Sequence, residues 1–388
     1  MLKLGDRMIV SWRTLGLSLL LSIIVGFTGA GELPDRIIEM LTSRAAYRDV
    51  SGDIVVVGID DRSLAQSHGG EFTRHDHARL ISAADKAGVK RLFVDFDYES
   101  PDSDGGLLAI AAAVRAMGDR AVVGAATRSV PGTDQLYTVF PPASFGTEAV
   151  RASLAWEYQF WQVWDVPLMY QAKGTLLPSF AAVLADKSAA RPSNFRIDFS
   201  YRTESIRQYS AVDVISGKVG ARELAGKDVI FAGTASRSPD RHYLPGHDLV
   251  AGAYIHLIAG ETLRRGDPVN LGWMPPLALA ILLILPLLLT GRSRRFNFIA
   301  LGIVAALIVT KLLLSSSLVT VSTGAGLFFI ATIGATVARY RRHQSAQREN
   351  PVSGLPNFEA LRSQPSFGSN TIVAAKLVNF ADLAAFLP

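Results

Sequence analysis

The sequence predicts an α/β domain outside the cytoplasm, with a mostly parallel sheet and helices on its faces, combined with four transmembrane helices. Hydrophobic residues make up 49% of the chain, and its mean hydropathy is +0.25. They concentrate near the N-terminus and in a block that begins at Met274. Strand and helix patterns alternate between these two regions, which favours helices packed on a parallel sheet.

Composition excludes several classes of chemistry. The 388 residues contain no cysteine, so disulfides, thiolate zinc sites and cysteine nucleophiles are excluded. The formal net charge of +5 could indicate nucleic-acid binding. Many of the basic residues flank apolar segments instead. We therefore expect no nucleic-acid partner and infer that these residues mark the cytoplasmic ends of membrane spans.

The first apolar segment, residues 9–30, is long enough to cross a bilayer and is interrupted by Arg13. A cleaved signal peptide is the alternative, because Lys3 and Arg7 form a basic N-terminal region. The length of the segment and the poor cleavage site at residues 28–30 favour an uncleaved anchor.

Three further spans are predicted at residues 274–290, 296–314 and 318–338. Pro286 should kink the second span of the chain. Lys311 lies near one end of the third, from where its ammonium group could reach the headgroups. Two buried helices of a soluble core are a weaker reading, because basic residues separate three closely spaced apolar runs.

Basic residues set the orientation, because they stay on the cytoplasmic side of a membrane. Three basic clusters fall on one side only if four spans leave both termini in the cytoplasm. Their members are Lys3 and Arg7; Arg292, Arg294 and Arg295; and Arg339, Arg341, Arg342 and Arg348. Trp12, Trp273 and Tyr340 then lie at the membrane interfaces, where aromatic residues concentrate. This topology describes a multi-pass membrane protein.

The predicted organisation has six parts, and residues 31–272 form the domain outside the cytoplasm. The others are a cytoplasmic N-terminus (1–8), the first span (9–30), three spans (273–338), a cytoplasmic linker (339–349) and a C-terminal fragment (350–388).

Within residues 31–272, short β-branched apolar runs indicate buried strands. These runs are 54–59, 91–96, 121–124 and 228–233, and 195–199 alternates like a half-exposed strand. Predicted helices cover 74–87, 107–117 and 252–264. Thr73 and Asp76 match a capping box for the first of these, and Gly88 can end it. The stretch 127–193 is less regular.

Polar residues follow several of these strands, and parallel strands bring their carboxyl ends to one sheet edge, where ligands of open α/β sheets bind. Asp60, Asp97, Thr234 and Arg237 are therefore candidates for a small-molecule pocket. The alternative is local structure: Asp60 or Asp61 could cap the next helix, and Asp97 could begin a turn before Pro101.

Other residues carry weaker signals, and we expect no catalytic residue, metal site or cofactor. His75 and His77 point in different directions on a helix. Asp97, Asp102 and Asp104 lack the spacing of a calcium loop. Trp156, Tyr158 and Phe160 alternate as on one strand face, where packing is commoner than ligand stacking. Complete nucleotide-binding, serine-hydrolase and zinc-protease motifs are absent from the sequence.

Residues 53–267 resemble the type-2 CHASE sensor domain, the extracellular module of bacterial cyclases and histidine kinases. The resemblance rests on motifs in the family's order, at residues 53–60, 93–96, 226–235 with Asp240, and 252–256. One span before the domain and three after it also fit that family. Tyr254 stands where an acidic residue is usual, and residues 70–74 replace a Trp-Pro-rich turn.

Residues 350–357, Asn-Pro-Val-Ser-Gly-Leu-Pro-Asn, resemble the opening motif of GGDEF domains. An active diguanylate cyclase would carry metal-binding Asp residues near positions 376 and 378, where Lys and Val stand. The Gly-Gly-Asp/Glu-Glu-Phe signature does not occur before Pro388. We therefore expect no cyclase activity from this polypeptide, and an output that is missing, incomplete or beyond it.

The resemblance implies a signal receptor that passes an unidentified extracytoplasmic stimulus inward, with cyclic-di-GMP turnover as its output. It also implies a homodimer in a bacterial inner membrane, where the predicted spans contact lipid. Two alternatives remain: a membrane-anchored extracytoplasmic enzyme using Asp60, Asp95 and Asp97, and an envelope-binding scaffold with no signalling output.

Overall fold

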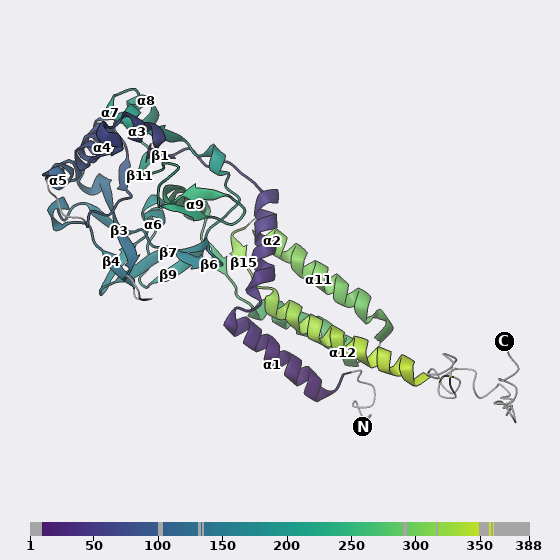
Figure 1. The fold of residues 1–388 in the computed structure, drawn as a ribbon. Helices are drawn as coiled ribbons and strands as arrows, with labels where there is room; N and C mark the ends of the chain where they lie inside the picture. Colours follow the sequence, from purple (N-terminus) through teal and green to yellow (C-terminus); the bar gives the residue numbers. More distant parts are fainter. Residues whose placement is uncertain are drawn as a thin grey trace, which may run out of the picture.

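The computed structural model describes residues 10–99, 104–130, 133, 136–289, 293–315, 317–348, 357 and 360. Figure 1 shows two parts, an α/β domain and a bundle of long helices that extends from its base. The predicted GGDEF-like fragment, Asp102 and Arg292 lie outside the described residues, apart from Asn357 and Ala360.

A seven-stranded sheet forms the centre of the α/β domain. Its order is β10-β1-β11-β2-β3-β4, with β5 also paired to β3, and every pairing is parallel except β3 with β4. All residues of β1 are buried, as expected for a parallel strand covered on both faces. The strands are β1 (Ile54–Ile59), β2 (Arg91–Val94), β3 (Ala121–Ser129), β4 (Leu136–Val139), β5 (Val150–Ser153), β10 (Gln208–Ser210) and β11 (Asp228–Gly233).

Helices cover both faces of this sheet. Val55 and Val57 of β1 face one core, which the α4, α5, α7 and α8 helices close. Ile54 and Val56 face a second core, which α6 and α9 close. The helices are α3 (Asp61–Gln66), α4 (Arg74–Lys86), α5 (Gly106–Met117), α6 (Phe180–Leu184), α7 (Ala211–Ile215), α8 (Ala221–Leu224) and α9 (Gly252–Arg265). The short 3₁₀ turns are η2 (His68–Gly70), η3 (Gly118–Arg120), η4 (Ala143–Phe145) and η5 (Thr203–Ser205).

The predicted start of α4 is confirmed. Thr73 and Asp76 form a reciprocal capping box, and Gly88 has a φ of +73° directly after the helix. Such a left-handed conformation suits glycine at a helix end.

The irregular middle of the chain forms a second, mostly antiparallel sheet that the sequence did not predict. Its strands are β6 (Glu157–Gln159), β7 (Gln162–Ala172), β8 (Thr175–Pro178), β9 (Ser193–Arg196), β12 (Arg241–Tyr243) and β13 (Leu249–Ala251). The prediction that Trp156, Tyr158 and Phe160 lie on one strand is wrong. The strand ends at Gln159, because Phe160 and Trp161 have φ values of +50° and +59° and form a turn.

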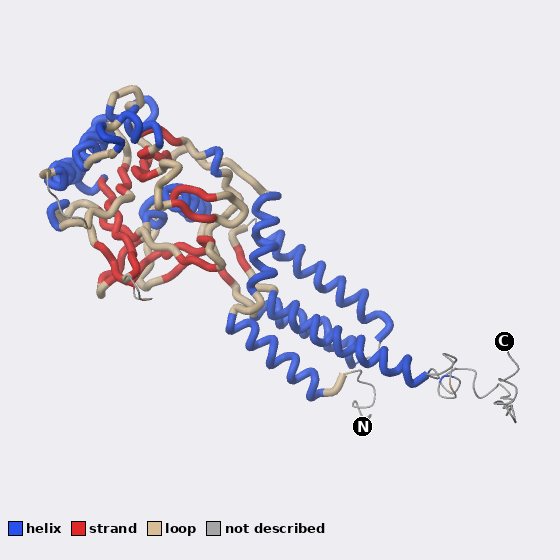
Figure 2. Tube along the Cα trace, viewed as in Figure 1, coloured by secondary structure: helices blue, strands red, loops and turns tan. Residues whose placement is uncertain are grey.

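Within the described residues, α1, α10, α11 and α12 form the bundle, and α2 lies between α1 and the domain (Figure 2). Along the chain they alternate in direction, and in Figure 1 the start of α1 and the end of α12 lie away from the α/β domain. Ile284, Phe329 and Ile333 are central to its apolar core. The helices are α1 (Trp12–Thr28), α2 (Glu32–Ala45), α10 (Met274–Leu289), α11 (Ser293–Ser315) and α12 (Gly324–Arg348). The two-residue strands β14 (Val269–Asn270) and β15 (Val319–Thr320) pair at the domain end of the bundle.

Length and composition decide whether a helix can cross a bilayer. Within the described residues, no single helix is both long and apolar enough to cross a bilayer, whereas α1 and α2 together are, although a 60° bend separates them. Met274–Leu289 and Phe296–Lys311 are shorter apolar helical stretches.

Lys311 differs from its prediction. Its ammonium group donates to Asp35 Oδ1 of α2 at 2.8 Å, and both side chains are buried. The same carboxylate accepts hydrogen bonds from the backbone nitrogens of Thr323 at 2.9 Å and Gly324 at 3.1 Å. Asp35 therefore caps the first turn of α12 while pairing with α11, and joins α2 to both helices.

Candidate ligand-binding site

The carboxyl edge of the parallel sheet places Asp60 in a local structural role. Asp60 caps α3, accepting from the backbone nitrogen of Ser63 at 2.8 Å and from the hydroxyl of Ser210 at 2.8 Å. Partial burial acts to raise the pKa of Asp60, but hydrogen bonds from Ser63 and Ser210 outweigh it and lower the pKa below its usual value. The carboxylate therefore stays ionised to stabilise the start of α3.

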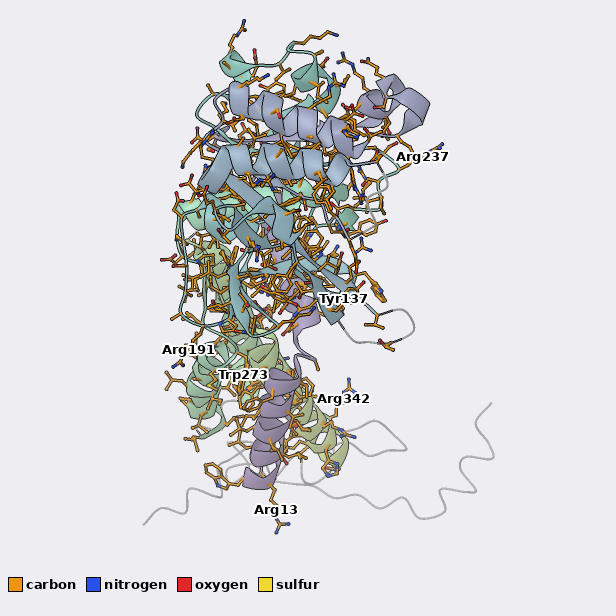
Figure 3. All side chains as sticks on the ribbon, turned by 90° about the vertical axis from the view of Figure 1, so that its left-hand side faces the viewer. Arg13, Tyr137, Arg191, Arg237, Trp273 and Arg342 are labelled. Carbon is orange, nitrogen blue, oxygen red and sulfur yellow. The ribbon has the colours of Figure 1, made fainter. Side chains whose placement is uncertain are left out.

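The other three predicted residues are dispersed. Asp97 accepts from Arg128 Nε at 3.0 Å, which neutralises it locally. Arg237 is exposed and points outward from the domain (Figure 3). Thr234 stays close to the end of β1, since its backbone nitrogen donates to the carbonyl oxygen of Ile59 at 3.0 Å. Among the four candidates, Thr234 lines the cavity described next.

This cavity, of about 600 Å³, lies between α2 and the α/β domain. Its volume is in the range of small-molecule sites. Residues that line it come from the end of α2, the segment before β10, the end of β11, the β12–β13 hairpin and α9. They are Arg44, Tyr47, Thr203, Glu204, Gln208, Thr234, Arg241, Ala251, Tyr254 and residues 246–250.

One wall is a chain of neutral hydrogen-bonding groups. Tyr254 donates its hydroxyl to Gln208 Oε1 at 2.8 Å, and Gln208 Nε2 donates to Thr234 Oγ1 at 3.1 Å. Burial raises the pKa of Tyr254, so its hydroxyl keeps its proton at neutral pH. A Cβ on Gly58 would overlap the Thr234 side chain, which explains why the strand beneath has glycine there.

The opposite wall belongs to α2 and the hairpin loop. Tyr47 donates its hydroxyl to the carbonyl oxygen of Gly246 at 2.9 Å, and Arg44 Nε donates to the same oxygen at 3.2 Å. Tyr47 also stacks on His247, with ring centroids 5.6 Å apart. The end of α2 is therefore attached to the loop that closes the cavity.

Four charged residues line the cavity, and their charges balance. Arg44 and Arg241 are cationic, whereas Glu204 and Asp248 are anionic. Within the described residues none of the four forms an ion pair. Arg241 donates one hydrogen bond to the carbonyl oxygen of Leu249 at 2.7 Å. Such a wall can bind a polar or charged small molecule through groups that have not already been neutralised.

A second polar cluster lies beneath the hairpin, and of its residues only Asp95 was a candidate from the sequence, in the enzyme alternative. Asp240 accepts from His242 Nε2 at 2.8 Å, and one carboxylate oxygen of Asp95 is buried without a hydrogen-bond partner among the described residues. Burial, with a further contribution from Asp240, raises the pKa of Asp95 well above its usual value. Neither ring nitrogen of the buried His256 has a described partner either.

One signal in the sequence could have indicated this cluster: His256 is a polar residue inside the apolar run at 253–259. Within the described residues, no group of three or more His, Asp and Glu side chains is arranged to hold a metal ion. The cluster and the cavity offer polar contacts and groups that can bind or release protons.

Comparison with known proteins agrees with this architecture. The CHASE2 domain model matches residues 17–292, from within α1 to just beyond α10. Curated proteins and solved structures were also compared, and none of them matches the chain. CHASE2 domains are extracellular sensor domains. The chain belongs to the CHASE2 domain family.

Proposed function

We propose that this protein is a transmembrane receptor whose α/β domain binds a small molecule outside the cytoplasm and passes the signal inward through its helices. In this proposal α1, α10, α11 and α12 cross the membrane, and both termini are cytoplasmic. Exposed apolar side chains on the outside of the bundle support it, because lipid would cover them. Leu20, Leu282, Phe298 and Leu301 are 55%, 69%, 80% and 68% exposed.

The observation that carries the proposal is the double role of α2. At one end Arg44, together with Tyr47 just after the helix, forms a wall of the cavity. Toward the other end Asp35 holds Lys311 of α11 and the first turn of α12. A ligand that shifts the end of α2 would therefore act on the helix that leads toward the cytoplasm. Such an effect requires a ligand that binds the shifted and unshifted states with different affinities.

The output is assigned to cyclic-di-GMP turnover because residues 350–357 resemble the start of a GGDEF domain. We extend the proposal to a homodimer, since relative motion of α12 helices in two copies can be transmitted to paired output domains. The ligand is expected to be polar, because the cavity wall carries hydrogen-bonding and charged groups.

Cells that contain the full chain provide the test. Cyclic-di-GMP is measured while extracts of spent medium and envelope material are supplied to the wild type and to Thr234→Val and Arg241→Ala variants. Arg237→Ala is the matched control, since Arg237 is exposed and does not line the cavity. We expect the wild type to change the cyclic-di-GMP level when an active extract is supplied. The change should be smaller in the two cavity variants and unaltered in the control. An equal response in all four proteins would refute the assignment of the cavity.

A further inference from the structure

In α2 the polar face is buried and the apolar face is exposed, the opposite of an ordinary surface helix. Its polar residues Asp35 and Arg36 are buried, whereas Leu33, Ile37 and Leu41 are 53%, 51% and 64% exposed. Residues four apart lie on the same face of a helix, so the three apolar side chains form one outward stripe. A surface helix normally presents the opposite arrangement to water.

The helix cannot rotate to bury this stripe, because its polar face is fixed by specific contacts. Asp35 is bonded to Lys311. The Arg36 guanidinium lies 4.3 Å from the ring centroid of Trp164. One turn further on, Glu39 pairs with Arg196 at 3.2 Å. Rotation of the helix would break all three contacts.

A second apolar feature lies beside the start of α2. The turn between β6 and β7 exposes Phe160 and Trp161, which are 51% and 87% exposed, and Tyr158 of β6 beside it is 51% exposed. Its preceding residue, Gln159, accepts a hydrogen bond from Arg36 through its side chain and another from Trp164 Nε1 through its carbonyl oxygen, the latter at 3.0 Å. The aromatic turn is thereby held against α2.

These two features continue the exposed apolar surface of α1. Ile24 and Phe27 near the end of α1 are 46% and 72% exposed. Phe27 also packs edge-to-face on Trp273, with ring centroids 5.0 Å apart, where α10 begins. Only the short turn around Gly31 separates this surface from Leu33, and α2 then departs from the direction of α1 by 60°.

We propose that the apolar collar, meaning Leu33, Ile37, Leu41, Tyr158, Phe160 and Trp161, contacts the outer surface of the lipid bilayer. This inference rests on the proposed transmembrane arrangement. A helix that follows a span at a sharp angle and has one apolar face is suited to the boundary between headgroups and acyl chains. Exposed Trp and Tyr side chains concentrate at the same level of a membrane. Lipid is favoured over a second copy of the chain because the collar continues the outer face of α1.

The absence of cysteine allows a direct test with single-cysteine variants of the full chain. Ile37→Cys and Phe160→Cys are labelled with a bimane fluorophore and reconstituted into phosphatidylcholine nanodiscs. Matched nanodiscs contain lipid with a nitroxide near the headgroup. Leu20→Cys, on the exposed face of α1, reports the span, and Glu204→Cys, at the cavity, reports a position away from lipid.

We expect the nitroxide to quench bimane at positions 37 and 160 and to leave position 204 unchanged. Quenching at position 20 alone would refute lipid contact by the collar but would still agree with the proposed transmembrane arrangement. Absence of quenching at position 20 as well would count against the membrane arrangement itself. Disulfide formation between two copies of Ile37→Cys without quenching would overturn lipid contact in favour of an interface between chains.

Discussion

Lys311 Nζ lies 2.8 Å from Asp35 Oδ1, and the two side chains are 8% and 6% exposed. The residues are 276 positions apart in the sequence, so the ion pair links α2, at the base of the α/β domain, to α11. Thr323 Oγ1 adds a donor to the same carboxylate oxygen at 2.6 Å. A buried ion pair contributes little net stability over an apolar pair, but removing one partner leaves the other charge buried and unpaired.

Asp35→Asn should therefore destabilise the protein strongly, by about 3–5 kcal/mol, because it leaves the ammonium group of Lys311 without a counter-charge. Lys311→Met should cost less, since Thr323 and Gly324 still donate to the carboxylate. The double variant should be more stable than the sum of the single losses predicts. Chemical unfolding in nanodiscs gives the free energy of unfolding of the wild type, the two single variants and the double variant. Strictly additive losses would show that the two groups are not coupled.

Gly324→Ala should destabilise the contact between the α1–α2 turn and α12. A Cβ at position 324 would overlap the carbonyl oxygen of Gly31, which is backbone and cannot turn aside. We expect a loss of about 1–3 kcal/mol, the usual range for overpacking, in thermal unfolding of the reconstituted protein. Gly302→Ala in α11 is the control, because nothing lies within 4 Å of a Cβ there. The control should be neutral or slightly stabilised, and equal behaviour of the two variants would contradict the close approach.

The parallel sheet was predictable from the sequence because its strands are short β-branched runs buried on both faces. Residues 54–59 and 228–233 were predicted as strands, and β1 and β11 have these bounds. The second sheet was not predictable, since β12 and β13 are three residues each and join it only through the pairing of Tyr243 with Gln162 of β7. Periodicity cannot be read from three residues.

The cavity was only partly predictable. Thr234 follows a strand that the sequence identifies, so its place at the sheet edge follows from topology. Arg44 lies in the last turn of α2 and Tyr47 follows the helix, and nothing in the local sequence places this end of α2 against residue 246. The pair of Asp35 and Lys311 was missed for the same reason: each residue in isolation suits a solvated or headgroup position.

Glu39 predicts a measurable dependence of stability on pH. Burial raises its pKa from 4.5 to about 7, against the opposing effects of Lys311 and Arg36. Below about pH 4.5 the carboxyl is protonated in both the folded and the unfolded chain. As the pH rises toward 7 the unfolded chain ionises first, so the free energy of unfolding falls, by an amount on the order of 3 kcal/mol.

Glu39→Gln should remove this contribution, because glutamine stays neutral throughout. The stability of the variant relative to wild type should therefore increase from pH 5 to pH 8 and then level off. Denaturant unfolding at several pH values gives this difference, with Glu204→Gln as the control because Glu204 is exposed. A difference that stays flat across this range would show that Glu39 is ionised in the folded protein below pH 5.

His256→Leu should stabilise the domain. The imidazole is fully buried between Trp156 and Phe180, whose rings lie 5.2 Å away in each case. Its two nitrogens have no described hydrogen-bond partner, and burial lowers its pKa to about 4, so it is neutral at pH 7. An unsatisfied buried polar group costs about 1–3 kcal/mol, and leucine carries none.

His242→Leu is the matched control and should destabilise the domain, since His242 Nε2 is hydrogen-bonded to Asp240 at 2.8 Å. Thermal unfolding at pH 7.5 compares the two variants. A loss of stability in both would mean that His256 has a hydrogen-bond partner in the folded protein, such as an internal water. If His256→Leu is more stable yet no longer responds to stimulus, stability cannot explain the presence of the histidine. The imidazole would then be needed for the response itself, as a group that gains or loses a partner when the domain changes state.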